Sequence, residues 1–278
     1  MAELLRAARQ ALAEKGNATP ALDARLLLQR ATGISHEAVI AHPRRLIAPE
    51  AAARFQAFLD RRLAGEPVSR ILGEREFYGR AFRITQATLD PRPDTETLIE
   101  AALAFMPADQ PCRIIDLGTG SGSIGVTLLA ERPRSHAVMT DISAEALAVA
   151  RENAELHGVL ARATFAHGSW FAGSRGAFDL ILSNPPYIAQ TILATLAAEV
   201  RNFDPETALV AGPDGLQAYR EIACAAGPFL APQGRVIVEI GEGQELEIEG
   251  IFRTEGFVAE TRWRDLSRRV RCLGFSHA

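Results

Sequence analysis

A glycine-rich turn follows a short apolar segment in the first half of the chain and reads Asp116-Leu117-Gly118-Thr119-Gly120-Ser121-Gly122. Glycines at alternate positions let the backbone turn sharply and approach a ligand where a Cβ atom would clash. A helix that starts after such a turn offers free N–H groups to a phosphate or a carboxylate. The run Gly120-x-Gly122-x-x-Gly125 also satisfies the dinucleotide fingerprint. The turn therefore predicts a cofactor site, and a tight turn that only packs a helix on a sheet is the alternative.

Asp141 ends the next predicted strand, about 20 residues after the glycine turn. A carboxylate at this position can accept hydrogen bonds from both hydroxyls of a ribose. The alternative is a cap for the helix expected over 144–156, although Ser143 is also a plausible N-cap. Because the glycine turn precedes it, Asp141 favours the binding of an adenosine-containing cofactor.

The segment Ser183-Asn184-Pro185-Pro186-Tyr187 follows another predicted strand. In open α/β sheets, ligands bind at the carboxyl ends of the strands. Asn184 offers a side-chain carbonyl oxygen, Pro185 offers a backbone carbonyl, and the two prolines stiffen the loop. Tyr187 adds a flat aromatic face. Two acceptors and a ring form a slot for a planar –NH₂ group, and a strand that merely ends in Pro-Pro is the alternative.

Alternating strands and helices are expected to position these residues. The predicted strands cover residues 113–117, 137–140, 163–167, 178–182 and 235–240, and 257–263 with 270–275 could close the sheet as an antiparallel pair. Apolar strands separated by helices predict an α/β fold with a parallel sheet that is covered by helices on both faces.

The N-terminal part has a different pattern. Residues 1–65 show apolar residues at helical spacing, broken by Pro43 and Pro49, and predict a small helical bundle. Residues 76–84 predict a β-hairpin around Gly79. The expected domains are a helical domain over 1–74 for substrate recognition, a hairpin linker over 75–90, and a catalytic domain over 91–278.

Composition excludes several classes of protein. Apolar residues make up 47% and charged residues 23% of the 278 residues, which is typical of a folded globular protein. The three cysteines and six histidines form no metal-binding spacing, so no metal is expected and a reducing cytoplasm is favoured. No apolar stretch reaches the roughly 20 residues that a membrane helix needs. The N-terminus predicts an amphipathic helix rather than a signal peptide.

The net charge of −4 is divided unevenly along the chain. Residues 1–88 hold 14 Arg and Lys against 9 Asp and Glu, whereas residues 89–278 hold 16 against 25. The acidic second part argues against a surface that tracks nucleic acid, because phosphate contacts need clustered Lys and Arg. The basic first part could face an acidic partner, or could be an ordinary solvated helical surface.

Taken together, these motifs resemble the class I S-adenosylmethionine-dependent methyltransferases that modify an amide or exocyclic amino nitrogen. Within that group the chain resembles the HemK/PrmC family, the peptide-chain release factor N5-glutamine methyltransferases. The resemblance spans nearly the whole chain and includes Phe77-Tyr78-Gly79, Pro91-Arg92-Pro93-Asp94-Thr95-Glu96, Gly168-Ser169-Trp170-Phe171, Gly212-Pro213-Asp214-Gly215-Leu216 and Glu239-Ile240-Gly241. It implies a Rossmann-like, doubly wound, mostly parallel seven-stranded sheet.

The resemblance also implies the site. S-adenosyl-L-methionine would be the cofactor, with its ribose on Asp141 and its adenine beside Trp170. Its methionine end would lie on the glycine turn, at Asp116, Gly118, Thr119, Gly120, Ser121 and Gly122. Asn184, which would also touch the cofactor, Pro185, Pro186 and Tyr187 would grip the glutamine amide of the Gly-Gly-Gln motif in a release factor. Arg92 is assigned no role.

The chemistry of the residues agrees with this implication. An amide nitrogen is a poor nucleophile, but a sulfonium methyl is a strong electrophile, so the protein mainly supplies alignment and desolvation. Hydrogen bonds from the –NH₂ group to Asn184 Oδ1 and the Pro185 carbonyl would stabilise the positive charge that develops on nitrogen. We therefore expect Asn184, Pro185 and Tyr187 to be the catalytic residues and expect no general base.

Three alternatives remain open. A glutamine methyltransferase that acts on a ribosomal protein would share every catalytic motif. An adenine-N6 nucleic-acid methyltransferase could use the same four residues, although the acidic catalytic part disfavours it. A nicotinamide-dependent dehydrogenase or a non-catalytic adenosine-binding module would explain the glycine turn but not Asn184 to Tyr187.

Overall fold

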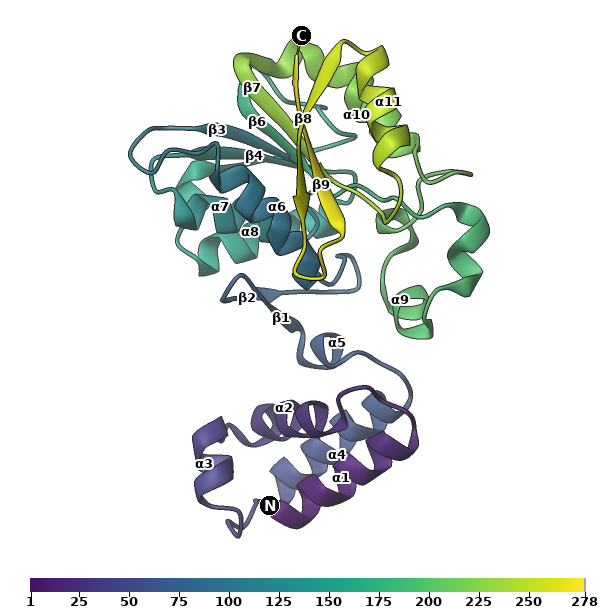
Figure 1. The fold of residues 1–278 in the computed structure, drawn as a ribbon. Coiled ribbons are helices and arrows are strands. Elements are labelled where there is room, and N and C mark those ends of the chain that lie inside the picture. The colour runs from purple at the N-terminus through teal and green to yellow at the C-terminus, as the bar shows by residue number, and fades with distance from the viewer. Residues whose placement is uncertain (278) are drawn as a thin grey trace. The chain divides into compact units, whose positions relative to one another are not determined.

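The computed structural model describes residues 1–277, which form two compact units. The first unit comprises residues 1–74 together with 197–203, and the second comprises 75–196 together with the described residues from 204 onward. Figure 1 traces the chain through both units. None of the helices in the described part of the chain is long and apolar enough to span a bilayer.

The first unit is helical. Its helices are α1 (Ala2–Glu14), α2 (Pro20–Thr32), α3 (His36–Ala41), α4 (Pro49–Leu63), α5 (Val68–Leu72) and α9 (Ala198–Phe203). Helices α2 and α4 begin at prolines, which suit the first helical position because its N–H has no partner within the helix. Aliphatic side chains of α1, α2 and α4 form the core with Phe55, which is fully buried.

A buried ion pair ties the helices of this unit together. Arg62 of α4 donates from Nε to Asp23 of α2 at 2.8 Å and from Nη1 to Glu199 of α9 at 2.6 Å. Arg62 and Asp23 are both buried, and a buried charge is tolerated only when it is paired in this way. The bond to Glu199 links α9, which lies far along the chain, to α4 within this unit.

The second unit contains a seven-stranded sheet in the order β5-β4-β3-β6-β7-β9-β8. The strands are β3 (Arg113–Leu117), β4 (His136–Asp141), β5 (Ala163–His167), β6 (Phe178–Ser183), β7 (Leu230–Glu239), β8 (Phe257–Arg264) and β9 (Val270–His277). Strands β3 to β7 are parallel, and β9 runs antiparallel to β7 and β8. The doubly wound sheet and its closing antiparallel pair confirm the predicted fold class.

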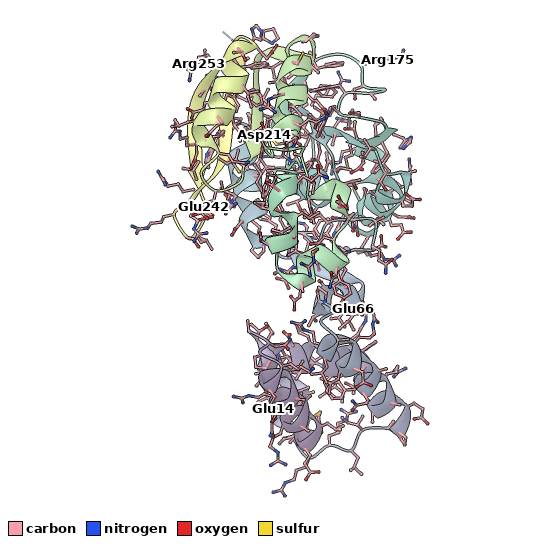
Figure 2. The ribbon with its side chains drawn as sticks, turned by 90° about the vertical axis from the view of Figure 1, so that its right-hand side faces the viewer. Glu14, Glu66, Arg175, Asp214, Glu242 and Arg253 are labelled. Atoms are coloured by element: carbon pink, nitrogen blue, oxygen red, sulfur yellow. The ribbon has the colours of Figure 1, made fainter. Side chains whose placement is uncertain are left out.

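Helices cover both faces of this sheet. On one face lie α6 (Glu96–Leu103), α7 (Ser123–Glu131) and α8 (Ala144–Leu156), and on the other lie α10 (Gln217–Ala226) and α11 (Glu245–Thr254). Adjacent residues of β3 serve opposite faces: Ile114 packs with the first group of helices and Ile115 with the second. Charged side chains such as Arg175, Glu242 and Arg253 remain at the surface (Figure 2).

A hairpin precedes the sheet. It consists of β1 (Glu74–Phe77) and β2 (Arg80–Arg83), joined by Tyr78 and Gly79, whose φ angles are 50° and 70°. Two central residues with positive φ are the pattern of a type I′ turn, which matches the twist of the strands. Phe77 and Phe82 point into the core beside α6. The hairpin turn lies where the sequence predicts it, but β1 begins two residues before the predicted range.

Two features of the second unit were not predicted. Strand β7 begins at Leu230 rather than near Arg235, because Leu230 already pairs with Phe178 and an irregularity follows before the pairing of Leu180 with Arg235. The connection between β6 and α10 contains the short 3₁₀ helices η3 (Gln190–Thr195) and η4 (Glu206–Ala208). Their apolar residues follow no clear period, so the sequence does not predict these two helices. The remaining 3₁₀ turns are η1 (Pro93–Thr95), η2 (Leu160–Arg162) and η5 (Gly227–Phe229).

Candidate active site

A pocket of the second unit lies at the carboxyl ends of β3, β4 and β6. After β3 the chain fills one side of the sheet with β4 and β5, and then returns to place β6 on the other side of β3. Ligands of open α/β sheets bind at this switch point. The residues that line the pocket belong to the segments 87–95, 118–124, 141–143, 168–170, 184–186 and 205–208, and Glu221 completes them.

The glycine turn forms the floor of the pocket. Gly118, Gly120 and Gly122 have φ angles of 68°, 57° and 79°, which side-chain-bearing residues rarely adopt. Gly122 is the N-cap of α7, and a Cβ atom on it would lie 3.0 Å from the Cβ of Ala150. Of the turn residues expected at the cofactor, Gly118, Thr119, Gly120 and Ser121 line the pocket, whereas Gly122 does not.

Asp116 stabilises the turn through hydrogen bonds and is not among the residues that line the pocket. Its Oδ2 atom accepts hydrogen bonds from Thr119 Oγ1 at 2.6 Å and from the Gly125 N–H at 3.1 Å. Full burial raises the pKa of Asp116 to about 6. Both hydrogen bonds hold the protein's own loop, whereas Oδ1 is buried without a partner among the described residues, and a contact of Asp116 with the cofactor stays a prediction.

Asp141 lies at the pocket wall and links two segments of the chain. Its Oδ2 atom accepts from the Gly120 N–H at 2.8 Å, and its Oδ1 atom accepts from the Ser143 N–H at 2.9 Å. The N-cap of α8 is Ser143, whose hydroxyl accepts from the Ala146 N–H. Asp141 is thus not the helix cap, and each carboxylate oxygen keeps lone pairs for a ligand hydroxyl.

We expect Asp141→Ala to weaken the binding of S-adenosylmethionine by about 1.5–3 kcal/mol, the worth of a hydrogen bond to a charged group. Isothermal calorimetry on the purified variant measures this loss. Glu145→Ala is a matched control, because it removes an exposed carboxylate four residues away that does not line the pocket. Equal affinities of the two variants would contradict a role for Asp141 in binding.

Trp170 forms a flat wall of the pocket. Its backbone has a φ angle of 44°, an uncommon value that fixes the direction in which the ring leaves the chain. The indole Nε1 atom donates to Glu221 of α10 at 2.6 Å, and Gln217 donates to the other oxygen of Glu221 at 2.9 Å. Sequence reasoning missed Glu221, because an exposed acidic residue on a helix carries no signal of its own.

Asn184 lines the pocket at the end of β6. Its Nδ2 atom donates to Thr95 Oγ1 at 3.2 Å, which leaves Oδ1 as the free acceptor. Pro186 also lines the pocket, whereas Pro185 is buried and, like Tyr187, is not part of the lining. Asn184 and Pro186 thus line the pocket, and contacts of Pro185 and Tyr187 with a substrate stay predictions.

Tyr187 anchors the loop behind the pocket. Its backbone carbonyl accepts from Gln244 Nε2 at 3.2 Å, and its ring packs against the core that includes α10 and α11. A Cβ atom at Gly215 would lie 2.4 Å from the Tyr187 carbonyl oxygen, so only glycine fits there. Burial raises the pKa of Tyr187 to about 12, so its hydroxyl stays protonated.

Arg92 and Asp204 join two segments that line the pocket. The Arg92 Nη2 atom lies 2.6 Å from Asp204 Oδ2, and the Asp204 side chain is almost fully buried. Arg92 lines the pocket within segment 87–95, and Asp204 directly precedes segment 205–208. The sequence assigned Arg92 no role because its partner lies 112 residues away.

Two buried carboxyl groups make stability depend on pH. Burial raises the pKa of Glu239 to about 7 and that of Asp116 to about 6, both above their values in an unfolded chain. The folded protein therefore holds protons that the unfolded chain has already released. These two protons add to the free energy of unfolding. Their contribution is fully present at pH values below the unfolded pKa values, and it is lost as the pH rises through about 6 and 7.

We expect Glu239→Gln to reduce this pH dependence. Wild-type protein should lose unfolding free energy on the order of a few kcal/mol between pH 5 and pH 8, and the variant should lose less. Urea titrations at both pH values measure the difference. An identical loss in the wild type and the variant would contradict a raised pKa at Glu239.

Comparisons with known proteins show the family of this chain. Residues 3–73 match the PrmC N-terminal domain, and residues 94–202 match the methyltransferase small domain. The chain is 49% identical to the release factor glutamine methyltransferase of Cereibacter sphaeroides, over 98% of this chain and 96% of that protein. It is 44% identical to the enzyme of the same name from Agrobacterium fabrum, over 99% and 96%. The chain belongs to the release factor glutamine methyltransferase family.

Membership of the release factor glutamine methyltransferase family confirms the predicted enzyme class, an S-adenosylmethionine-dependent methyltransferase. A solved structure agrees with the fold: the catalytic domain of hMettl16, in complex with hairpin 6 of the MAT2A 3′UTR, matches with a TM-score of 0.58. The match covers 82% of each chain at 17% identity, so it speaks for the fold alone. Among residues 1–277 no group of three or more His, Cys, Asp and Glu side chains is placed to hold a metal ion.

Proposed function

We propose that this chain transfers the methyl group of S-adenosylmethionine to the side-chain amide nitrogen of a glutamine in the Gly-Gly-Gln motif of a peptide-chain release factor. One observation carries the proposal: Asn184 presents a free Oδ1 atom beside the glycine turn, because Thr95 occupies its Nδ2 atom. An acceptor aimed into a cofactor pocket suits a substrate that brings an –NH₂ group. The two relatives named above are each named release factor glutamine methyltransferase, which supports a glutamine of a release factor as the substrate.

The pocket residues fit the cofactor by their chemistry. The backbone of Gly118 to Ser121 leaves room at the floor for the methionine end. The Asp141 oxygens keep lone pairs for the two ribose hydroxyls, and Trp170 supplies a flat face for a purine. When bound, S-adenosylmethionine supplies an electrophilic methyl group.

The protein's contribution is to bind and align the amide. In our proposal the substrate –NH₂ group donates one hydrogen bond to Asn184 Oδ1 and a second to the Pro185 carbonyl. Both acceptors stabilise the positive charge that grows on nitrogen as it attacks, and the neighbouring apolar residues exclude water. Tyr187 supports this loop from behind, and its neutral hydroxyl adds no charge to the site. The methylated nitrogen then loses a proton without a dedicated base.

The experiment that tests the proposal is methylation with labelled S-adenosylmethionine followed by peptide mass mapping. Purified release factor is expected to gain one methyl group on the glutamine of its Gly-Gly-Gln motif. The same factor with that glutamine changed to alanine is the control and should gain none. Label on a ribosomal protein or on adenine in nucleic acid, with none on the release factor, would replace this proposal by one of the alternatives.

We place the enzyme in the cytoplasm, where release factors act on ribosomes, with no role for nucleic acid or membrane. The cysteines support a reducing compartment: Cys112 and Cys272 are buried, Cys224 is exposed, and all three are free thiols. The excess of acidic residues after residue 88 also disfavours binding to phosphate backbones.

A further inference from the structure

Thr95 lies where the 3₁₀ turn η1 continues into helix α6. Its backbone is helical, with φ −65° and ψ −18°, so its hydroxyl is not placed to cap the helix and makes no cap hydrogen bond. Thr95 is only 3% exposed, yet it lines the pocket. A buried hydroxyl needs partners, so those of Thr95 must lie elsewhere.

One partner is Asn184. The Thr95 Oγ1 atom accepts from Asn184 Nδ2 at 3.2 Å, across 89 residues of sequence. An asparagine amide can rotate by half a turn and exchange its donor and acceptor with little change of shape. The contact with Thr95 removes this ambiguity only if the hydroxyl acts as an acceptor toward Asn184. Its own proton must then point to another group.

A carboxyl group lies beside this pair: Glu239 ends β7 and follows Val238, which pairs with Ser183, the residue before Asn184. Glu239 is 1% exposed, and the Thr95 hydroxyl is the hydrogen-bonding side chain that lowers its pKa against the effect of burial. Its Oε2 atom has no hydrogen-bond partner among the described residues. Arg271 and Arg92 also favour the ionised carboxylate, whereas Asp94 disfavours it. In its ionised form Glu239 accepts and cannot donate, and in that form it fixes the direction of the Thr95 proton.

We propose that Thr95 and Glu239 position Asn184: the carboxylate holds the Thr95 hydroxyl as a donor, the hydroxyl oxygen receives Asn184 Nδ2, and Asn184 Oδ1 is thereby held toward the substrate. Neither Thr95 nor Glu239 touches the reacting atoms in this arrangement. Both act through Asn184. This inference rests on the proposed function for its substrate, but its geometric content concerns the free enzyme and is tested there first.

The direct test observes the Asn184 side chain without any substrate. The ¹⁵N–¹H signals of its amide, assigned by their absence in Asn184→Ala, should show slowed hydrogen exchange in the wild-type enzyme. In Thr95→Val, which removes the hydroxyl but keeps the shape, exchange should accelerate at least about tenfold, and Thr95→Ser should restore protection. Unchanged exchange in Thr95→Val would overturn the proposal, whether or not release factor is the substrate.

Kinetics then tests the consequence for turnover. Thr95→Val should lower kcat by roughly 10- to 100-fold, the range for residues that orient a functional side chain. The KM for S-adenosylmethionine should stay within a factor of about three, and Thr95→Ser should recover most of the rate. Thr127→Val is the matched control: Thr127 is fully buried in α7, away from the pocket, and should keep full activity. Equal losses in the two valine variants would mean a general packing effect and would reject the proposal.

A double-variant cycle separates positioning from an independent role. In the Asn184→Ala background, Thr95→Val should cause no further loss, because its effect passes through Asn184. Glu239→Gln can both accept and donate, so it should lower kcat less than Thr95→Val does. An additive loss in the double variant would overturn the proposal. A wild-type enzyme that shows the protected amide but leaves release factor unmethylated would instead reject only the proposed function.

Discussion

Asn184→Ala is expected to reduce methyl transfer by roughly two or more orders of magnitude, the scale on which a positioned polar group contributes to catalysis. Its Oδ1 atom is the free side-chain acceptor at the end of β6, and alanine leaves nothing to receive a substrate –NH₂ proton. Cofactor binding should change little, because Asp141 and the glycine turn are untouched. The loss should therefore fall on the chemical step.

Single-turnover assays with saturating S-adenosylmethionine separate these effects, and calorimetry reports the cofactor affinity. Asn202→Ala is a suitable control, since Asn202 is an exposed asparagine of α9 in the other unit. A rate for Asn184→Ala within a factor of a few of the wild type would place the amide slot elsewhere.

Removing residues 1–74, which make up most of the first unit, is expected to abolish most methylation of intact release factor while cofactor binding survives. Every residue that lines the pocket belongs to the second unit. A glutamine amide offers too little surface for specificity, so a second contact must select the protein substrate. A second contact raises apparent affinity by roughly 100-fold or more, and a chain of residues 75–278 should lose about that factor. The basic balance of residues 1–88 favours an acidic face on the partner.

The comparison uses the full-length chain and the shortened one on three readouts: binding of S-adenosylmethionine, methylation of a short Gly-Gly-Gln peptide, and methylation of intact release factor. Only the third should collapse. The shortened chain lacks Arg62, which pairs with Glu199 of α9 in the full chain. The first two readouts would detect any unfolding that this loss causes. In the full chain, Arg44→Glu with Arg45→Glu reverses two exposed charges and should weaken methylation of the intact factor most at low salt. Equal activity of all chains on intact release factor would refute a substrate role for this unit.

The sequence predicts the fold well because the second unit repeats one local rule. The buried strands β3 and β6 are largely apolar runs, and α8 begins at a recognisable cap, Ser143. The loops that carry the glycine turn and Asn184 follow strands directly. Parallel topology then brings them to the same edge of the sheet. Local pattern and one topological rule are sufficient for that much of the site.

The rest of the site depends on contacts between distant residues. Thr95 meets Asn184 across 89 residues, and Trp170 meets Glu221 across 51. Neither pair lies at a sequence separation that predicts a contact. Asp116 shows the opposite difficulty, because an acid at the end of a strand before a glycine turn can hold either a ligand or the turn itself. Its hydrogen bonds to Thr119 and Gly125 show that it holds the turn, which the spacing alone does not predict.

The wall formed by Trp170 also gives the enzyme an internal optical probe. The chain contains two tryptophans, and only Trp170 lines the pocket. Trp263 lies on β8, and its ring packs edge-to-face on Phe105 with the ring centroids 6.1 Å apart. A ligand that stacks on Trp170 changes the surroundings of its indole, and one that displaces Glu221 from Nε1 changes the hydrogen bond on which its emission depends. Trp263→Phe would leave a single fluorophore at the pocket, so the filling and emptying of the site could be followed in real time without a label.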